Sequence, residues 1–204
     1  MRIRRRARDP LARRPRLQPS APQPWHRPQT LFPGLVPLGP LLFGRPGRAA
    51  VAITGMSAFS NGFEFVVTRL IRPDTPGWDE EPFAAHGAFE VGLRLSDGRA
   101  VNGGRPSGDT EPAEPFLRPA GGGATSHYSQ QRWWAWPLPP SGPLEFVCRW
   151  PSMGISQASV SIDADLILEA ARRSIQVWPE SPTGSWLAPG RSARDHREVF
   201  ELGG

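Results

Sequence analysis

The feature that most constrains the fold of this chain is an aromatic segment at residues 132–151, RWWAWPLPPSGPLEFVCRWP. Two extended runs flank a Pro-Pro-Ser-Gly-Pro turn, a pattern that predicts a β-hairpin. Side chains of this size need a core to pack against, so we expect the hairpin to lie at the centre of the folded unit. The segment holds four of the eight Trp residues and the only Cys, at positions Trp133, Trp134, Trp136, Trp150 and Cys148.

Strand alternation assigns the indoles of the first arm to two faces. Trp134 and Trp136 share one face, and Trp133 lies on the opposite face, where we expect the most exposed indole. Two interpretations stay open. The indoles pack in the core, or at least one of Trp133, Trp134 and Trp136 belongs to a ligand platform that stacks sugars or bases.

Two more hairpins are predicted upstream, because Asn-Gly and Asp-Gly pairs tolerate the positive φ angles of tight turns. Asn61-Gly62 joins an apolar run that starts near Ala49 to FEFVVTRLI, and Asp97-Gly98 joins FEVGLRL to a short returning strand. In FEFVVTRLI, Phe63, Phe65 and Val67 lie on one face, with Glu64, Val66 and Thr68 on the other. Further strands are expected at residues 116–118 and 158–162.

One helix is predicted late in the chain. Asp163 stands where an N-cap belongs, ahead of ADLILEAARRS, and the apolar residues of that run fall on one helical face. The helix is expected at about residues 163–174. Short strands separated by turns, with one late helix, predict a mainly β fold: an antiparallel β-sandwich, or an open barrel, with one C-terminal α-helix.

Composition divides the chain into three expected regions. Residues 1–30 form a disordered Arg/Pro-rich leader, residues 31–179 a single β-rich domain, and residues 180–204 a flexible C-terminal tail. The leader has hardly an apolar side chain, so it cannot offset the entropy of ordering. The apolar run at 31–43 is broken by three Pro residues and is too short to span a bilayer, so we expect no membrane span.

The positive charge belongs to the leader. Residues 1–27 carry nine Arg and one acid, a balance of +8, whereas the remaining 15 Arg face 18 acids, a balance of −3. Three interpretations stay open: a solvated arm, an arm that contacts nucleic acid or acidic lipid, and a start codon placed too far upstream. The residues expected to contact an anion or nucleic acid are Arg4, Arg5, Arg6, Arg13 and Arg14.

Several kinds of chemistry are excluded or weakly supported. Every basic residue other than His is Arg, so a Schiff-base lysine, a pyridoxal-phosphate anchor and a phosphate-loop lysine are excluded. A single Cys forms no internal disulfide and fits a cytoplasmic location. The four His residues are scattered, and the triple glycine at 121–123 lacks the helix start and cationic partner of a phosphate cradle. We expect no enzyme activity, cofactor or metal.

Several segments resemble the landmarks of an uncharacterised actinobacterial protein family. They are FPGLVP at 32–37, NGFEF at 61–65, RPAGGG at 118–123, WAWPLPPSGPLEFVCRWP at 134–151, and the ILEAARR helix followed by VWP at 177–179. The resemblance covers roughly residues 32–179 and leaves out the Arg-rich leader. It implies no activity, because none is assigned to the family.

Three functions follow as hypotheses. The first is a non-catalytic β-sandwich that binds a protein partner, and it predicts that the indoles are buried. The second is a small-ligand or carbohydrate-binding module, and it predicts an exposed aromatic row on one sheet face. The third is a nucleic-acid accessory protein that acts through the Arg-rich N-terminal leader, and it predicts that binding depends steeply on salt concentration.

Overall fold

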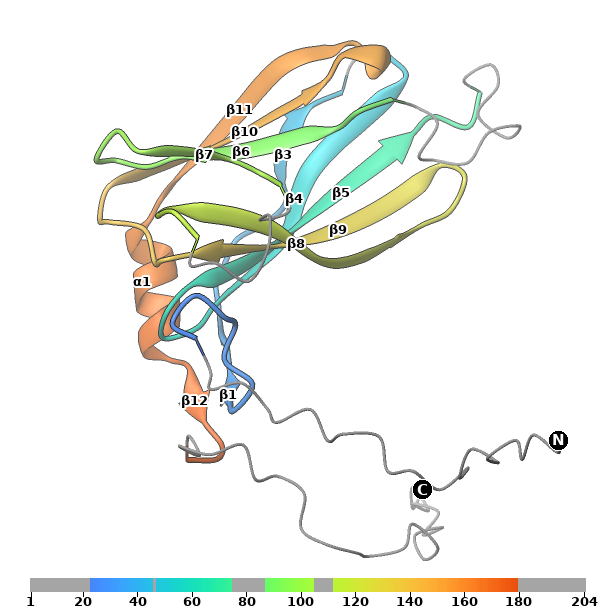
Figure 1. Ribbon diagram of the computed structural model, residues 1–204. Coiled ribbons are helices and arrows are strands. Elements are labelled where there is room, and N and C mark those ends of the chain that lie inside the picture. The colour runs from blue at the N-terminus through green and yellow to red at the C-terminus, as the bar shows by residue number, and fades with distance from the viewer. Residues whose placement is uncertain (1–22, 46, 75–86, 105–111, 180–204) are drawn as a thin grey trace, which may run out of the picture. The chain divides into compact units, whose positions relative to one another are not determined.

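The computed structural model describes residues 23–45, 47–74, 87–104 and 112–179 (Figure 1). These residues confirm a mainly β, antiparallel fold with one α-helix. Within them the strands form a six-stranded sheet, a four-stranded sheet and a two-stranded ribbon. The two larger sheets face each other as the layers of a sandwich, and neither closes into a barrel.

The six-stranded sheet contains hairpins, each formed by two strands that are consecutive in the sequence. Its strands, in spatial order, are β2 (Gly34–Leu35), β4 (Ala49–Ala58), β5 (Phe63–Ile71), β9 (Tyr128–Trp136) and β8 (Phe116–Ala124), and β3 (Leu41–Gly44) also pairs with β4. The predicted Asn61-Gly62 hairpin is confirmed, since Ala58 pairs with Phe63 across the turn. Strand β8 is longer than predicted and runs through the triple glycine to Ala124.

The four-stranded sheet holds the second half of the aromatic segment. Its strands, in spatial order, are β11 (Ile155–Asp163), β10 (Pro143–Trp150), β6 (Glu90–Arg94) and β7 (Ala100–Asn102), and a short 3-10 helix, η2 (Pro151–Met153), links β10 to β11. The predicted Asp97-Gly98 hairpin is confirmed. Gly98 has φ +88°, and Asp97 Oδ1 accepts the backbone N–H of Arg99 at 3.0 Å.

The main core lies between the two sheets. Phe63, Phe65 and Val67 of β5 point inward and are buried, as their alternation predicts. Across the gap Phe146 of β10 meets the edge of Phe65, with ring centroids 5.0 Å apart. Trp150 lies in the same core and packs edge-on against Phe89. These contacts hold the two layers together through apolar burial.

The prediction that residues 132–151 form one hairpin is wrong. Strand β9 pairs with β5 and β8, whereas β10 pairs with β6 and β11, so the two arms belong to different sheets. The connection contains Pro137, Pro139 and Pro140, which have no N–H to donate to a hairpin ladder. Its far end is anchored on the four-stranded sheet, where Ser96 Oγ donates to the Ser141 carbonyl at 2.7 Å. The proline segment is therefore a crossing between layers.

Helix α1 (Asp165–Arg172) follows β11 and confirms the predicted helix. The N-cap residue is Ala164, one position after the predicted Asp163, and Asp163 Oδ1 accepts the backbone N–H of Asp165 at 2.9 Å. The apolar face of α1, with Ile167 and Ala170, is buried against the end of the sandwich. Gly34 is required there, because a Cβ at this position would lie 1.8 Å from the Ala170 carbonyl oxygen.

Residues 23–30, which lie within the predicted leader, pack on the six-stranded sheet, and three short strands precede Ala49. Strand β1 (Leu31–Phe32) pairs with β12 (Ile175–Gln176), which comes directly after α1. This β1–β12 ribbon lies beside the far end of α1 in Figure 1.

Candidate functional site

Trp133, the indole expected to be most exposed, is buried. It lies in the main core with Phe65, its partner on β5, and only 7% of its surface is exposed. Gly103 approaches the ring so closely that a Cβ there would lie 2.5 Å from it. The expectation of an exposed Trp133 is not met, because this face of β9 is the one that points between the sheets.

Trp134 and Trp136 lie on the outer face of the six-stranded sheet, yet they are also buried. Together with Phe59 and Phe116 they form a second apolar cluster, which we call the outer aromatic cluster. Trp134 packs edge-on against Phe59 at 5.7 Å, and Phe116 lies 5.8 Å from Trp136. Because this cluster lies outside the main core, something else must cover it.

Residues 23–31, which we call the N-terminal segment, supply that cover. Trp25 packs edge-on against Trp136 at 6.4 Å, and its carbonyl accepts the indole N–H of Trp134 at 2.9 Å. The Asn61 side chain donates to the carbonyls of Pro24 and His26 at 2.6 and 2.8 Å. The chain's own residues therefore occupy the face that a stacked sugar or base would need, and the structure favours the core interpretation for all three indoles.

The other predicted contacts give no site in the described part of the chain. Arg4, Arg5, Arg6, Arg13 and Arg14 all lie outside the described residues. Cys148 is buried, and burial raises the pKa of its thiol to about 12, so it is not an activated nucleophile. Among the described residues no group of three His, Cys, Asp or Glu side chains could hold a metal, and no helix is long and apolar enough to cross a membrane.

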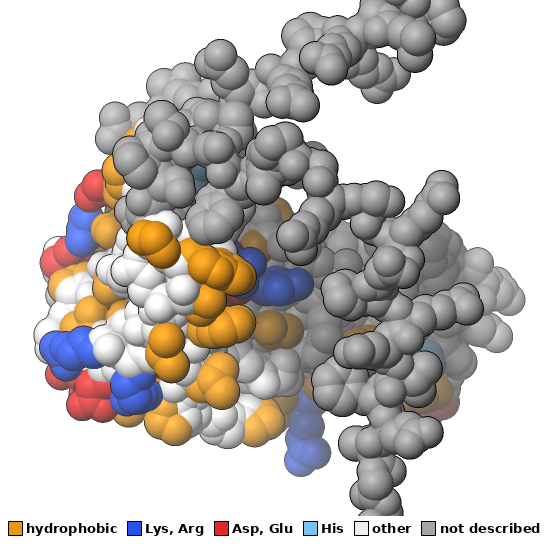
Figure 2. Space-filling model, turned by 90° about the horizontal axis from the view of Figure 1, so that it is seen from below, with side chains coloured by type: hydrophobic (Ala, Val, Ile, Leu, Met, Phe, Trp, Pro, Cys, Tyr) orange, Lys and Arg blue, Asp and Glu red, His pale blue; other side chains and the backbone are white. Residues whose placement is uncertain are grey.

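The first surface with functional character is the β1–β12 ribbon. Phe32 and Ile175 pair directly across its two strands and are 64% and 65% exposed. Val177 and Trp178 follow Ile175 and are also exposed, and the backbone of Val177 is held by the Thr30 carbonyl. We call these four side chains the ribbon surface. Figure 2, viewed from this end, shows hydrophobic side chains gathered on the molecular surface.

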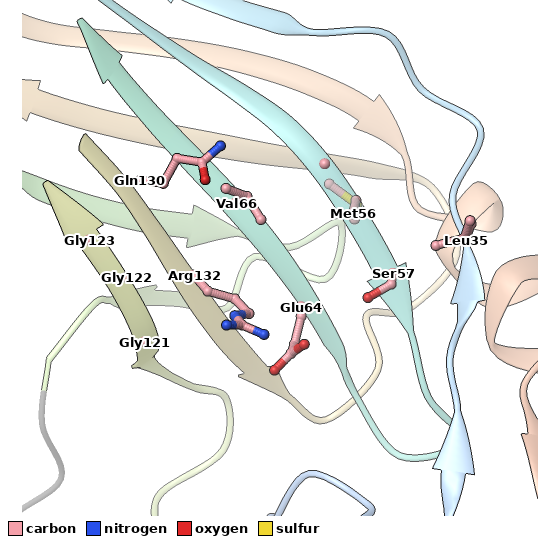
Figure 3. A pocket seen from close by; sticks show the side chains of 11 residues that line it. Leu35, Met56, Ser57, Glu64, Val66, Gly121, Gly122, Gly123, Gln130 and Arg132 are labelled. Carbon is pink, nitrogen blue, oxygen red and sulfur yellow. The ribbon is translucent and has the colours of Figure 1, made fainter. Parts of the chain in front are cut away.

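The second surface is a groove of about 510 Å³ on the outer face of the six-stranded sheet (Figure 3). It lies beside the part of the face that the N-terminal segment covers. The lining residues are Leu35 of β2, residues 55–57 of β4, Glu64 and Val66 of β5, residues 121–123 of β8, and Gln130 and Arg132 of β9. A groove of this volume is large enough for a small organic molecule.

Two charged side chains face each other in this groove. Glu64 is 6% exposed, and burial raises the pKa of its carboxyl, an effect that Arg27 and Arg132 oppose. Arg27 of the N-terminal segment forms the ion pair, with its Nε 3.2 Å from Glu64 Oε1. Figure 3 shows the Arg132 side chain reaching toward Glu64 from the neighbouring strand. The Arg132 guanidinium lies above Gly121 and is exposed.

Glu64, Arg132 and the triple glycine were not predicted to form a site. Strand alternation correctly places Glu64 on the face opposite to Phe63. A Glu on the outer face of a sheet is normally expected to be solvated, so its burial was not predicted. The triple glycine lacks a cationic partner within the sequence around it, yet the β8–β9 pairing brings Arg132 opposite Gly121. The sequence feature that could have indicated this site is the glycine run at residues 121–123, because it leaves part of one strand without side chains.

No protein-family model, curated protein or solved structure matches this chain. The chemistry of the ribbon surface and of the groove therefore carries the functional argument.

Proposed function

We propose that this protein is a non-catalytic β-sandwich binding module that recognises a protein partner through the ribbon surface. The observation that carries the proposal is the directly paired and highly exposed Phe32 and Ile175. Large apolar side chains grouped on a surface are typical of interaction sites, and aromatic residues such as Trp178 are enriched where protein interfaces are most buried.

The ribbon is also held in place, which favours recognition without a large ordering cost. The backbone pairing of β1 with β12 fixes Phe32 against Ile175. Arg173, at the end of α1, donates from Nη2 to the Leu35 carbonyl at 3.1 Å and ties the helix end to β2. The proposal includes a cytoplasmic location, supported by the single Cys, and membership of the actinobacterial family, supported by the motifs at 32–37 and 134–151.

The test replaces the central pair of the ribbon surface. We expect the double variant Phe32→Ser/Ile175→Ser to keep its fold, because both side chains are exposed, and to lose a partner that the wild-type chain captures from an extract of its source organism. Affinity for that partner, purified and measured by calorimetry, should fall at least about tenfold, as expected when anchor residues are truncated.

Leu42→Ser is the matched control, because Leu42 is 51% exposed on β3 and is not part of the ribbon surface. This variant should bind the partner like the wild type. If every captured protein binds the double variant and the wild type equally, the ribbon surface is not the recognition surface and the proposal is wrong.

A further inference from the structure

The groove exists because four of its lining positions have no side chain. Gly55 lies at an irregularity in the β4–β5 pairing, and residues 121–123 line the opposite wall on β8. Val66 of β5 lies between these glycines and forms part of the floor. Gly121 has φ +131°, and a Cβ at Gly122 would lie 2.3 Å from the Gln130 carbonyl oxygen, so the sheet itself needs glycine at both positions. A Cβ at Gly123 would have no atom within 4 Å, so a side chain could be accommodated there. The packing of the sheet therefore does not need glycine at position 123, but its lack of a side chain keeps the groove open.

The charges around the groove are unequal. Glu64 is neutralised by its ion pair with Arg27, whereas Arg132 has no ion pair with another described residue. The two guanidinium groups and the one carboxylate leave a net positive charge of one. An exposed guanidinium beside an open groove is suited to bind a carboxylate or phosphate through paired N–H donors.

We propose that the groove is a binding site for a small hydroxylated monocarboxylate, a molecule of the hydroxy-acid or sugar-acid class. Arg132 binds the carboxylate. The Glu64 carboxylate, the Gln130 amide and the Ser57 hydroxyl line the same space and exchange hydrogen bonds with ligand hydroxyl groups. This site is separate from the ribbon surface and does not depend on the protein-binding function proposed above.

The net charge of the groove selects between the two anions that Arg132 could bind. A phosphate carries up to two negative charges at neutral pH, one more than the single net positive charge of Arg27, Arg132 and Glu64 balances. A monocarboxylate balances the single net positive charge and leaves Glu64 free to accept hydrogen bonds from hydroxyl groups. A neutral sugar offers the hydroxyl groups but not the anion, so it should bind more weakly than its acid.

The experiment is an NMR titration of the full ¹⁵N-labelled chain with gluconate, glucose and inorganic phosphate, each up to roughly 20 mM because first ligands of this size often bind in the millimolar range. Gluconate is expected to shift the amide signals of residues 121–123 and 130–132. Glucose and phosphate are expected to bind at least about tenfold more weakly, because glucose lacks the carboxylate and phosphate lacks the sugar-like hydroxyl groups.

Two variants test the residues. Arg132→Gln should weaken gluconate binding about tenfold or more, since it removes the charged donor. Gly123→Val fills the groove with a residue suited to strands and should abolish the shifts. Gly39→Val is the matched control, because a Cβ at Gly39 also has no atom within 4 Å and Gly39 does not line the groove. It should bind like the wild type.

Each of three results would overturn the proposal. The first is the absence of gluconate shifts in the wild type. The second is gluconate binding that persists unchanged in both Arg132→Gln and Gly123→Val, with their spectra showing a folded chain. The third is phosphate binding as tight as gluconate binding, which would assign the groove to inorganic anions.

Discussion

Replacing Trp150 with alanine is expected to lower the free energy of unfolding by about 3–5 kcal/mol, the usual cost of removing a buried aromatic side chain. Trp150 is fully buried in the main core and packs edge-on against Phe89 at 6.0 Å. The Arg69 guanidinium lies 5.4 Å from its ring and 4.6 Å from that of Phe89. Removing the indole therefore opens a large cavity and takes away one of the aromatic partners of a half-buried cation.

Urea unfolding followed by circular dichroism gives the measurement, and Trp178→Ala is the matched control. Trp178 is 51% exposed on the ribbon surface, so its removal should change the free energy of unfolding by less than about 1 kcal/mol. If Trp150→Ala leaves no folded population, Trp150→Phe gives a smaller loss that can be measured. Equal effects of the Trp150 and Trp178 substitutions would contradict the assigned core.

Deletion of residues 1–30 is expected to lower the free energy of unfolding by about 4–5 kcal/mol, whereas deletion of residues 1–22 keeps the contacts of the N-terminal segment and should not cause this loss. The first deletion removes Trp25 from the outer aromatic cluster, and with it about 1–2 kcal/mol of apolar burial. It also removes the carbonyls that accept from Trp134 and Asn61, each bond contributing about 1 kcal/mol. The loss of Arg27 leaves the buried Glu64 without its ion-pair partner.

Tryptophan fluorescence distinguishes the two deletions a second time. Because deletion of residues 1–30 exposes Trp134 and Trp136 to water, their emission should shift to longer wavelength and become accessible to acrylamide. The shorter deletion retains the N-terminal segment, so its spectrum should match that of the full chain apart from small changes. Two deletions of equal stability and equal emission would show that the N-terminal segment does not cover the cluster.

Local patterns predicted the individual elements of this fold well. The Asn61-Gly62 and Asp97-Gly98 turns and the α1 helix are specified by residues within a few positions of each other, and all three are confirmed. The partner of each strand is a non-local property. The prolines at 137, 139 and 140 fit a hairpin turn as well as a crossing between sheets, so the assumption that neighbouring arms pair led to the wrong prediction.

The burial of the three indoles likewise combines a local property, which the sequence pattern predicts, with a non-local one, which it does not. Alternation correctly separated Trp133 from Trp134 and Trp136, but it could not say which face of β9 points between the sheets. Nor could it show that Trp25, more than 100 positions earlier, covers the outer face. The groove escaped prediction for a related reason, since Glu64, Arg132 and residues 121–123 meet only through the order β5-β9-β8.

Hydroxyl-radical footprinting of the full chain, read residue by residue by mass spectrometry, tests most directly where the exposed aromatic surface lies. Oxidation rates follow solvent exposure, so we expect Trp178 and Phe32 on the ribbon surface to react at least about tenfold faster than Trp134 and Trp150. That result would support a module whose apolar binding surface is the β1–β12 ribbon. Oxidation of Trp133, Trp134 and Trp136 at the rate of Trp178 would contradict it, because the three indoles would then form an exposed aromatic face.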